Sequence, residues 1–391
     1  MTERIYLDHA ATTPTDEAVL REMLPYFTAV FGNASSTHRA GRDAVAAVDR
    51  ARETIARLLH ASPSEIYFTS GGTESDNWAL RGIAAAYSEK GKHIVATSIE
   101  HPAVLGALKK LEKAGYEVTY LPVDDNGYVS PESVKQALRE DTVLLTVMTV
   151  NNEVGSIQPI REIASVAHER GVIFHTDAVQ AAGILPLDVR EMGVDALSVS
   201  AHKFYGPKGV GALYLRKGVK IDRLLAGGEQ ERNLRGGTYN TPAIVGMGAA
   251  LERAVNALPE VTSHLSKLKE RFLSLTDEYI RLNGGEPSHP GIVNLLFYGV
   301  RNDDLLSALD RAGIEASAGS ACSSGSTEPS HVLAAMGRSE SEIKSSVRFS
   351  FGKENTLEEI DRAIAVIKEL TSRLRKDADL FKVYASTKKN L

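Results

Sequence analysis

The middle of the chain alternates short β-rich runs with amphipathic stretches. Seven such runs occur at 65–70, 93–98, 117–123, 142–151, 172–178, 196–204 and 209–216. Helical periodicity separates several of them, most clearly at 74–90, 103–114 and 160–170. Strands that alternate with helices predict a largely parallel sheet covered on both faces. Because ligands of such sheets bind at the carboxyl ends of the strands, we expect the functional residues there.

The pattern changes near residue 241. A long helical stretch at 243–282 is followed by a predicted strand at 291–297, a helix at 303–312, a strand at 346–351 and a last helix at 357–376. These elements predict a second, α+β segment after the main sheet. The short apolar stretch 5–8 stands too far from the other runs to be placed by periodicity, and the tail from about residue 377 is polar.

Composition narrows the class of protein. The 391 residues are 43% hydrophobic and 24% charged, which is typical of a soluble globular protein of two domains. A net charge of −5 predicts no general attraction to nucleic acid or anionic membranes. No apolar run reaches about 18 residues, so we expect neither a transmembrane helix nor a signal peptide. A single cysteine excludes an internal disulfide and a multi-cysteine metal site, and fits a reducing cytosol.

The run 65–70 ends in Gly71-Gly72-Thr73, directly before a predicted helix. Glycines let the backbone approach a ligand, and the start of a helix offers unpaired N–H groups, so this segment can hold a phosphate. Taken alone, the motif is more typical of a tight strand–helix turn. It is neither a Walker loop nor a dinucleotide fingerprint.

Two further runs end in groups that could react. Asp177 closes the run 172–178, where a buried acid needs a cationic partner such as a protonated pyridine nitrogen, although a helix cap is the commoner role. Lys203 closes the run 196–204, where loss of water favours the uncharged, nucleophilic amine. Ser200 and His202 beside it are donors suited to a phosphate. The residues alone leave Lys208 as a rival for the same role.

Cys322 lies in the segment AGSACSSGS at 318–326, with no apolar neighbour larger than alanine within four residues. Lone cysteines usually pack as small hydrophobes, but this polar, glycine-containing setting favours a reachable, reactive thiol. Polar residues also close or interrupt other runs: His101, Asn152, Glu153 and Arg348. Each alone suits a cap, a turn or a surface charge. Their gathering at the carboxyl ends of several runs favours a site at the sheet edge.

Taken together, these stretches resemble the NifS/IscS-type (class I) cysteine desulfurases, which belong to the class-V aminotransferase family of pyridoxal-phosphate enzymes. The resemblance covers nearly the whole chain and rests on an ordered set of motifs: YLDHAATTP (6–14), FGNASS (31–36), TSGGTES (69–75), EHP (100–102), VNNE (150–153), HTDAVQ (175–180), SAHK (200–203), RGGT (235–238), the Cys322 segment and SVRFS (346–350). The long Ser/Gly-rich segment around Cys322 resembles the first class, whose loop carries sulfur to partners. The Arg-x-Gly-x-x-Cys pattern of the second class is absent.

The resemblance implies a fold-type I α/β architecture. We expect a mostly parallel seven-stranded sheet in a large domain at 15–258, and a smaller α+β domain formed by 1–14 and 259–376 that carries the cysteine loop. Residues 377–391 would form a C-terminal tail. The resemblance also implies a homodimer, with Thr238 contributed to the other subunit's site.

The resemblance assigns roles to single residues. Lys203, the lysine that follows Ser-Ala-His, binds pyridoxal 5′-phosphate covalently and moves protons, and Cys322 receives the substrate's sulfur. His101 stacks on the cofactor ring, Asp177 pairs with the ring nitrogen, and Gln180 binds the phenolic oxygen. The residues that bind the phosphate are Gly72, Thr73, Ser200, His202 and Thr238. Asn152 and Arg348 bind the carboxylate of the substrate.

The implied reaction removes sulfur from L-cysteine, leaving L-alanine and a Cys322 persulfide. The implied acceptors are an iron–sulfur scaffold protein or a tRNA-thiolation enzyme in the cytoplasm. Within one chain we expect no metal site, although Cys322 could ligate a transient iron–sulfur cluster together with a scaffold. The rivals are another enzyme of the same fold, such as a selenocysteine lyase or an aminotransferase, and a non-catalytic sulfur-relay scaffold. We expect no direct contact with nucleic acid or membrane.

Overall fold

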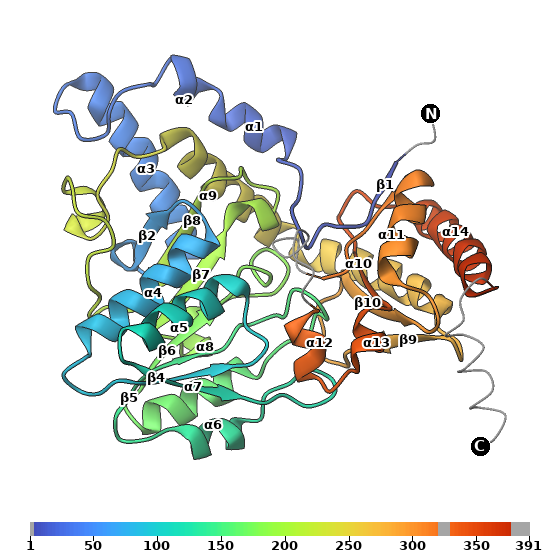
Figure 1. Cartoon of the computed structure of the whole chain (residues 1–391). Helices are drawn as coiled ribbons and strands as arrows, with labels where there is room; N and C mark the ends of the chain where they lie inside the picture. The colour runs from blue at the N-terminus through green and yellow to red at the C-terminus, as the bar shows by residue number, and fades with distance from the viewer. Residues whose placement is uncertain (1–3, 320–328, 377–391) are drawn as a thin grey trace.

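The computed structural model describes residues 4–319 and 329–376 and is built around two sheets of different size (Figure 1). The larger sheet has seven strands, which confirms the expected mostly parallel α/β architecture. Only β8 runs against its neighbours. In spatial order the strands are β2 (Ile66–Thr69), β8 (Gly211–Leu215), β7 (Ala196–Ser200), β6 (Ile173–Asp177), β5 (Thr142–Thr146), β3 (His93–Thr97) and β4 (Glu117–Leu121).

Helices cover both faces of this sheet because its strands are apolar on both sides. In β3, Val95 belongs to one hydrophobic cluster while Ile94 and Ala96 belong to another, as the alternation of a strand requires. The first cluster includes residues of α3 (Arg39–Leu58), α6 (Pro131–Ala137), α7 (Ile160–Glu169), α8 (Val189–Met192) and α9 (Thr241–Asn256). The second includes residues of α4 (Gly72–Ala86) and α5 (Pro102–Lys113). Every predicted run of the main sheet therefore contains a strand.

The smaller sheet, beside the large one in Figure 1, is antiparallel with the order β12 (Ser346–Ser350), β10 (Ile292–Phe297) and β9 (Ile280–Asn283). A separate core joins it to α10 (Leu258–Phe272), α11 (Asn302–Arg311) and α14 (Leu357–Lys376). The N-terminal strand β1 (Ile5–Tyr6) also lies here, paired with β11 (Ile314–Glu315). The predicted domain boundaries at 14/15 and 258/259 stay a prediction.

The expected continuous helix at 243–282 is wrong. α9 ends at Asn256 and α10 begins at Leu258, with Pro259 in its first turn. A proline is tolerated there because a first-turn N–H has no partner within the helix. After the short turn η4 (Leu273–Leu275), the end of the stretch forms β9, an edge strand of the smaller sheet. Pairing with β10 decides that conformation, and the periodicity of the sequence does not indicate this pairing.

Short elements complete the fold. They are α1 (Glu17–Met23), α2 (Pro25–Thr28), α12 (His331–Ala335), α13 (Glu340–Ile343), and the single turns η1 (Pro63–Glu65), η2 (Ala201–Lys203) and η3 (Gln230–Asn233). None of the helices formed by the described residues is both long and apolar enough to cross a membrane. Cys322 and the tail 377–391 lie outside the described residues.

Candidate active site

A cavity of about 120 Å³ lies where the carboxyl ends of the parallel strands meet the smaller sheet, and it collects most of the predicted site residues. Eight of the predicted cofactor residues line it: Gly72, Thr73, His101, Asp177, Gln180, Ser200, His202 and Lys203. The two predicted substrate residues, Asn152 and Arg348, also lie on its wall. These ten residues come from separate stretches of the chain, so only the fold brings them together.

The lysine follows β7 in the single turn η2, which turns the chain back toward β8. Lys203 Nζ donates to the backbone carbonyls of Ala10 and Ala11, the latter at 2.8 Å, and both alanines also line the cavity. Lys208 Nζ instead donates to the carbonyl of Thr13 at 3.3 Å and is not part of the cavity wall. Between the two candidate lysines, the geometry therefore favours Lys203.

The N-terminus of α4 forms one wall of the cavity. Gly71 has a φ of +151°, which only glycine adopts readily, and Gly72 begins the helix. A Cβ on Gly72 would lie 2.7 Å from Cγ2 of Val179, so a side chain would not fit without movement. The helix start presents backbone N–H groups, and Ser200 and His202 add side-chain donors. This donor set suits a phosphate.

Asp177 ends β6 at another wall of the cavity. Val179 N–H donates to Asp177 Oδ1 at 2.8 Å, which fixes the carboxylate and leaves the second oxygen for another partner. Burial raises the pKa of Asp177 to about 6, and the Val179 N–H and the charge of Lys203 oppose that rise. A cationic nitrogen beside this carboxylate would oppose it further. The carboxylate therefore suits a protonated pyridine ring.

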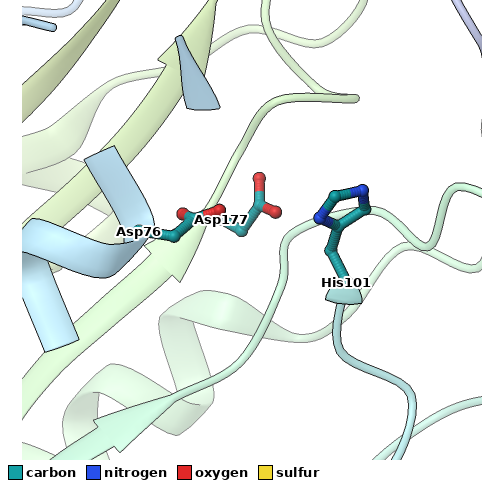
Figure 2. Close-up of side chains that lie close together, drawn as sticks. All are labelled: Asp76, His101 and Asp177. Carbon is teal, nitrogen blue, oxygen red and sulfur yellow. The ribbon is translucent and has the colours of Figure 1, made fainter. Parts of the chain in front are cut away.

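His101 caps the N-terminus of α5. Its Nδ1 accepts from Ala103 N–H at 3.1 Å, so in the neutral ring the proton is on Nε2. Burial, followed by the charge of Lys203, lowers the pKa of His101 to about 4. The side chain is therefore a neutral, flat imidazole at neutral pH, as stacking on a cofactor ring requires. One ring nitrogen of His101 lies within 4.8 Å of a carboxylate oxygen of Asp76 and of Asp177, and these two oxygens are equally close to each other (Figure 2).

Arg348 lies on β12 of the smaller sheet and is almost completely buried. One terminal nitrogen donates to the backbone carbonyl of Asn152 at 2.9 Å, and the other pairs with Asp8 at 2.8 Å. Among the described residues, Nε has no hydrogen-bond partner. A buried guanidinium with an unused donor on the cavity wall suits a substrate carboxylate.

The described residues on both sides of Cys322 contact this same region. Ser317 Oγ donates to Asp8 at 2.9 Å, and Ser330 Oγ donates to Glu153 Oε2 at 2.5 Å. Asp8 holds Arg348, and Glu153 follows Asn152 in the chain. The described residues that flank the Cys322 segment therefore contact the neighbours of the cavity residues Asn152 and Arg348.

Two predicted cofactor residues, Gln180 and Thr238, have positions that differ from each other. Gln180 Nε2 donates to the carbonyl of Ala10 at 2.9 Å. Thr238 is exposed in a loop and does not line the cavity of its own chain. Sequence reasoning missed Asp76 on the cavity wall and the role of Asp8. Asp76 stands four residues after Gly72, the spacing of one helix face, and Asp8 lies inside a motif already singled out.

The functional groups of the site fit those of pyridoxal phosphate. It has an amine for the aldehyde, a buried carboxylate for the ring nitrogen, a neutral imidazole for the ring face and a helix N-terminus with a hydroxyl for the phosphate. These groups match the cofactor implied by the sequence motifs.

Comparison with known proteins agrees with this interpretation. The model of the family described as "Aminotransferase class-V" matches residues 5–363. The chain is 50% identical over 378 residues to "Cysteine desulfurase IscS" of Methanosarcina thermophila, covering 95% of this chain and 93% of that protein. It is 46% identical over 394 residues to the protein of the same name from Clostridium botulinum, covering 99% of both.

Solved structures are similar as well. A structure described as "NIFS-LIKE PROTEIN" superimposes with a TM-score of 0.89 at 39% identity, covering 95% of this chain and 99% of that one. A second, described as "SspA in complex with cysteine", has a TM-score of 0.81 at 39% identity, covering 89% and 99%.

Proposed function

The chain belongs to the class-V aminotransferase family and is a pyridoxal-phosphate-dependent cysteine desulfurase, and we propose how the residues of its cavity divide the work. The observation that carries the proposal is the convergence of ten predicted residues on one cavity. When bound, pyridoxal phosphate withdraws electrons from the substrate's α-carbon and thereby makes the carbon–sulfur bond breakable. The protein supplies position, charge and protons.

We propose that Lys203 would bind the cofactor covalently and that its amine moves protons at the α- and β-carbons of the substrate. Asp177 holds the proton on the ring nitrogen, and His101 lies against the ring. Gly72, Thr73, Ser200 and His202 bind the phosphate, and Gln180 binds the phenolic oxygen. The placement of these groups around one cavity supports the assignment.

Asn152 and Arg348 are proposed to bind the carboxylate of cysteine. Arg348 lines the cavity, and its Nε has no hydrogen-bond partner among the described residues, which supports this role. Binding of the carboxylate would orient the substrate in the cavity. The contacts of Ser317 and Ser330, which flank the Cys322 segment, support a site that Cys322 can reach.

Cys322 is proposed to attack the sulfur of the bound cysteine as a thiolate. A sulfur–sulfur bond forms while the carbon–sulfur bond of the substrate breaks, and its electron pair remains on carbon. Protonation of that carbon gives L-alanine, and the enzyme keeps the sulfur as a Cys322 persulfide. The thiolate is the reactive form, and the polar, glycine-containing sequence around Cys322 favours this role.

The sulfur is proposed to pass to an iron–sulfur scaffold protein or a tRNA-thiolation enzyme in the cytoplasm. We further propose that the active protein is a homodimer in which Thr238 reaches the phosphate of the other subunit. The exposure of Thr238 outside its own cavity supports this arrangement. A transient iron–sulfur cluster shared by Cys322 and a scaffold protein belongs to the same proposal.

Cys322→Ser tests the proposed division of work. The hydroxyl is too weak a nucleophile toward sulfur at neutral pH, so the variant should bind cofactor and cysteine and then stall without alanine. Mass spectrometry of the wild type after substrate should find added sulfur on the peptide that contains Cys322, the single cysteine of the chain. Normal alanine release by the variant would refute the role of Cys322 and favour a mechanism of the selenocysteine-lyase kind.

A further inference from the structure

Asp76 is a buried acid on the cavity wall that the proposed reaction does not use. It lies on α4, its side chain is about 1% exposed, and it lines the same cavity as Asp177. Its Oδ1 has no hydrogen-bond partner among the described residues and lies 3.7 Å from Nε2 of His175. In Figure 2 the carboxylate of Asp177 lies between Asp76 and His101. A fully buried polar atom without a partner requires an explanation.

The charges around Asp76 make its own ionisation unfavourable. Burial raises the pKa of Asp76 well above its usual value, and the negative charge of Asp177 raises it further. Glu100, a third buried acid, also contributes, and burial raises its pKa to about 8. Burial lowers the pKa of His175 to about 3, so this ring offers no compensating charge at neutral pH. Two carboxylates with oxygens within 4.8 Å cannot both ionise in a buried site without a large cost.

A polar network centred on His175 lies beside the Asp76 side chain. His175 Nε2 lies 3.0 Å from Ser198 Oγ, and His175 Nδ1 lies 2.9 Å from Thr146 Oγ1. Ser198 opposes the rise in the pKa of Asp76. Asp177 on β6 pairs in register with Ser198 on β7. The network therefore connects the strand that carries Asp177 to the helix that carries Asp76.

We propose that Asp76 is a positioning residue for the cofactor nitrogen, a neutral acid beside Asp177 that leaves one negative charge in the pair and keeps that charge on Asp177. The proposal rests on the proposed role of Asp177. A second charge at Asp76 would repel the first, and an apolar side chain would provide no dipole to stabilise it. A neutral, polar group of this size avoids both costs.

The test measures how strongly the site prefers a ring nitrogen that can be protonated. Each variant is stripped of cofactor and titrated with pyridoxal phosphate and with 1-deaza-pyridoxal phosphate, in which carbon replaces the ring nitrogen. The measured quantity is the ratio of the two dissociation constants. Asp76→Asn keeps a neutral polar group and should preserve the wild-type ratio within about threefold. Asp76→Leu should reduce the preference tenfold or more, the change that one pKa unit represents.

The controls separate this proposal from the role of Asp177. Asp177→Asn should abolish the preference; if it does not, the proposed pairing with the ring nitrogen fails. If Asp177→Asn abolishes the preference but both Asp76 variants retain it, Asp76 only packs and the present proposal is overturned. An equal loss in Asp76→Asn and Asp76→Leu would mean that Asp76 acts as an anion, which also overturns it. If Asp76→Leu does not fold, judged by near-UV circular dichroism, Asp76→Ala replaces it with the same expected loss.

Discussion

Asp8→Ala should leave the guanidinium of Arg348 buried without its counter-charge. The Arg348 side chain is 1% exposed and that of Asp8 is 16% exposed, and their charged atoms are 2.8 Å apart. Breaking a buried ion pair from one side costs about 3–5 kcal/mol, because the remaining charge stays desolvated. At roughly 2–4 °C per kcal/mol for domains of 150–250 residues, the melting temperature should fall by about 10 °C.

The same variant should respond more strongly to a carboxylate ligand. A carboxylate bound near the unused Nε of Arg348 would supply the charge that Asp8 no longer provides. Ligand binding to the folded state alone stabilises it, so part of the lost stability should return on addition of L-alanine, the product. Ethylamine, which lacks the carboxylate, should return none of it.

The assay is thermal unfolding of the cofactor-loaded protein with and without each ligand. Asp8→Asn is the matched control, because its amide oxygen still accepts from Arg348 but its charge is lost. We expect it to lie between wild type and Asp8→Ala. An unchanged melting temperature for Asp8→Ala would refute the cost assigned to the buried charge. Equal stabilisation by L-alanine and ethylamine would refute Arg348 as the carboxylate-binding residue.

Lys203→Ala should abolish turnover and the yellow colour of the purified protein. Lys208→Ala should remain active, because Lys208 does not line the cavity. The reverse result would move the covalent attachment to Lys208. Asp177→Asn should slow turnover by about 100- to 1,000-fold, since preorganised charge terms are worth about 3–4 kcal/mol, and a loss below about fivefold would contradict its role. Mixing Lys203→Ala chains with chains altered at 235–239 should recover some activity in verified heterodimers, and complete failure would count against sites shared between subunits.

The family motifs predicted the cofactor chemistry well because they lie at the ends of strands. Glycine, acid, lysine and histidine each follow a β-rich run, and strand ends gather at one edge of a parallel sheet. The residues alone left Lys203 and Lys208 open as rivals. The turn η2 separates them, because it places the Lys203 amine beside Ala10 and Ala11 and leaves Lys208 outside the cavity.

What the sequence could not predict depends on partners far away in the chain. Asp8 and Arg348 are separated by 340 positions, and no local pattern indicates that they pair. Asp76 faces Asp177 only because α4 packs against the sheet that contains β6. The stretch 276–282 has no local feature that distinguishes a helix continuation from an edge strand, and β10 decides it by pairing with Ile280–Asn283.

By itself, the sequence determined most of the order of strands and helices, which follows from alternation and turn residues, both of them local. The cofactor class and the roles of single residues were implied by the resemblance of an ordered set of motifs to a known family. The tertiary structure alone decided which groups share one charge environment. Burial and proximity act through space, so the lowered pKa of His101, the raised pKa of Asp177 and the counter-charge of Arg348 exist only once distant segments have packed together.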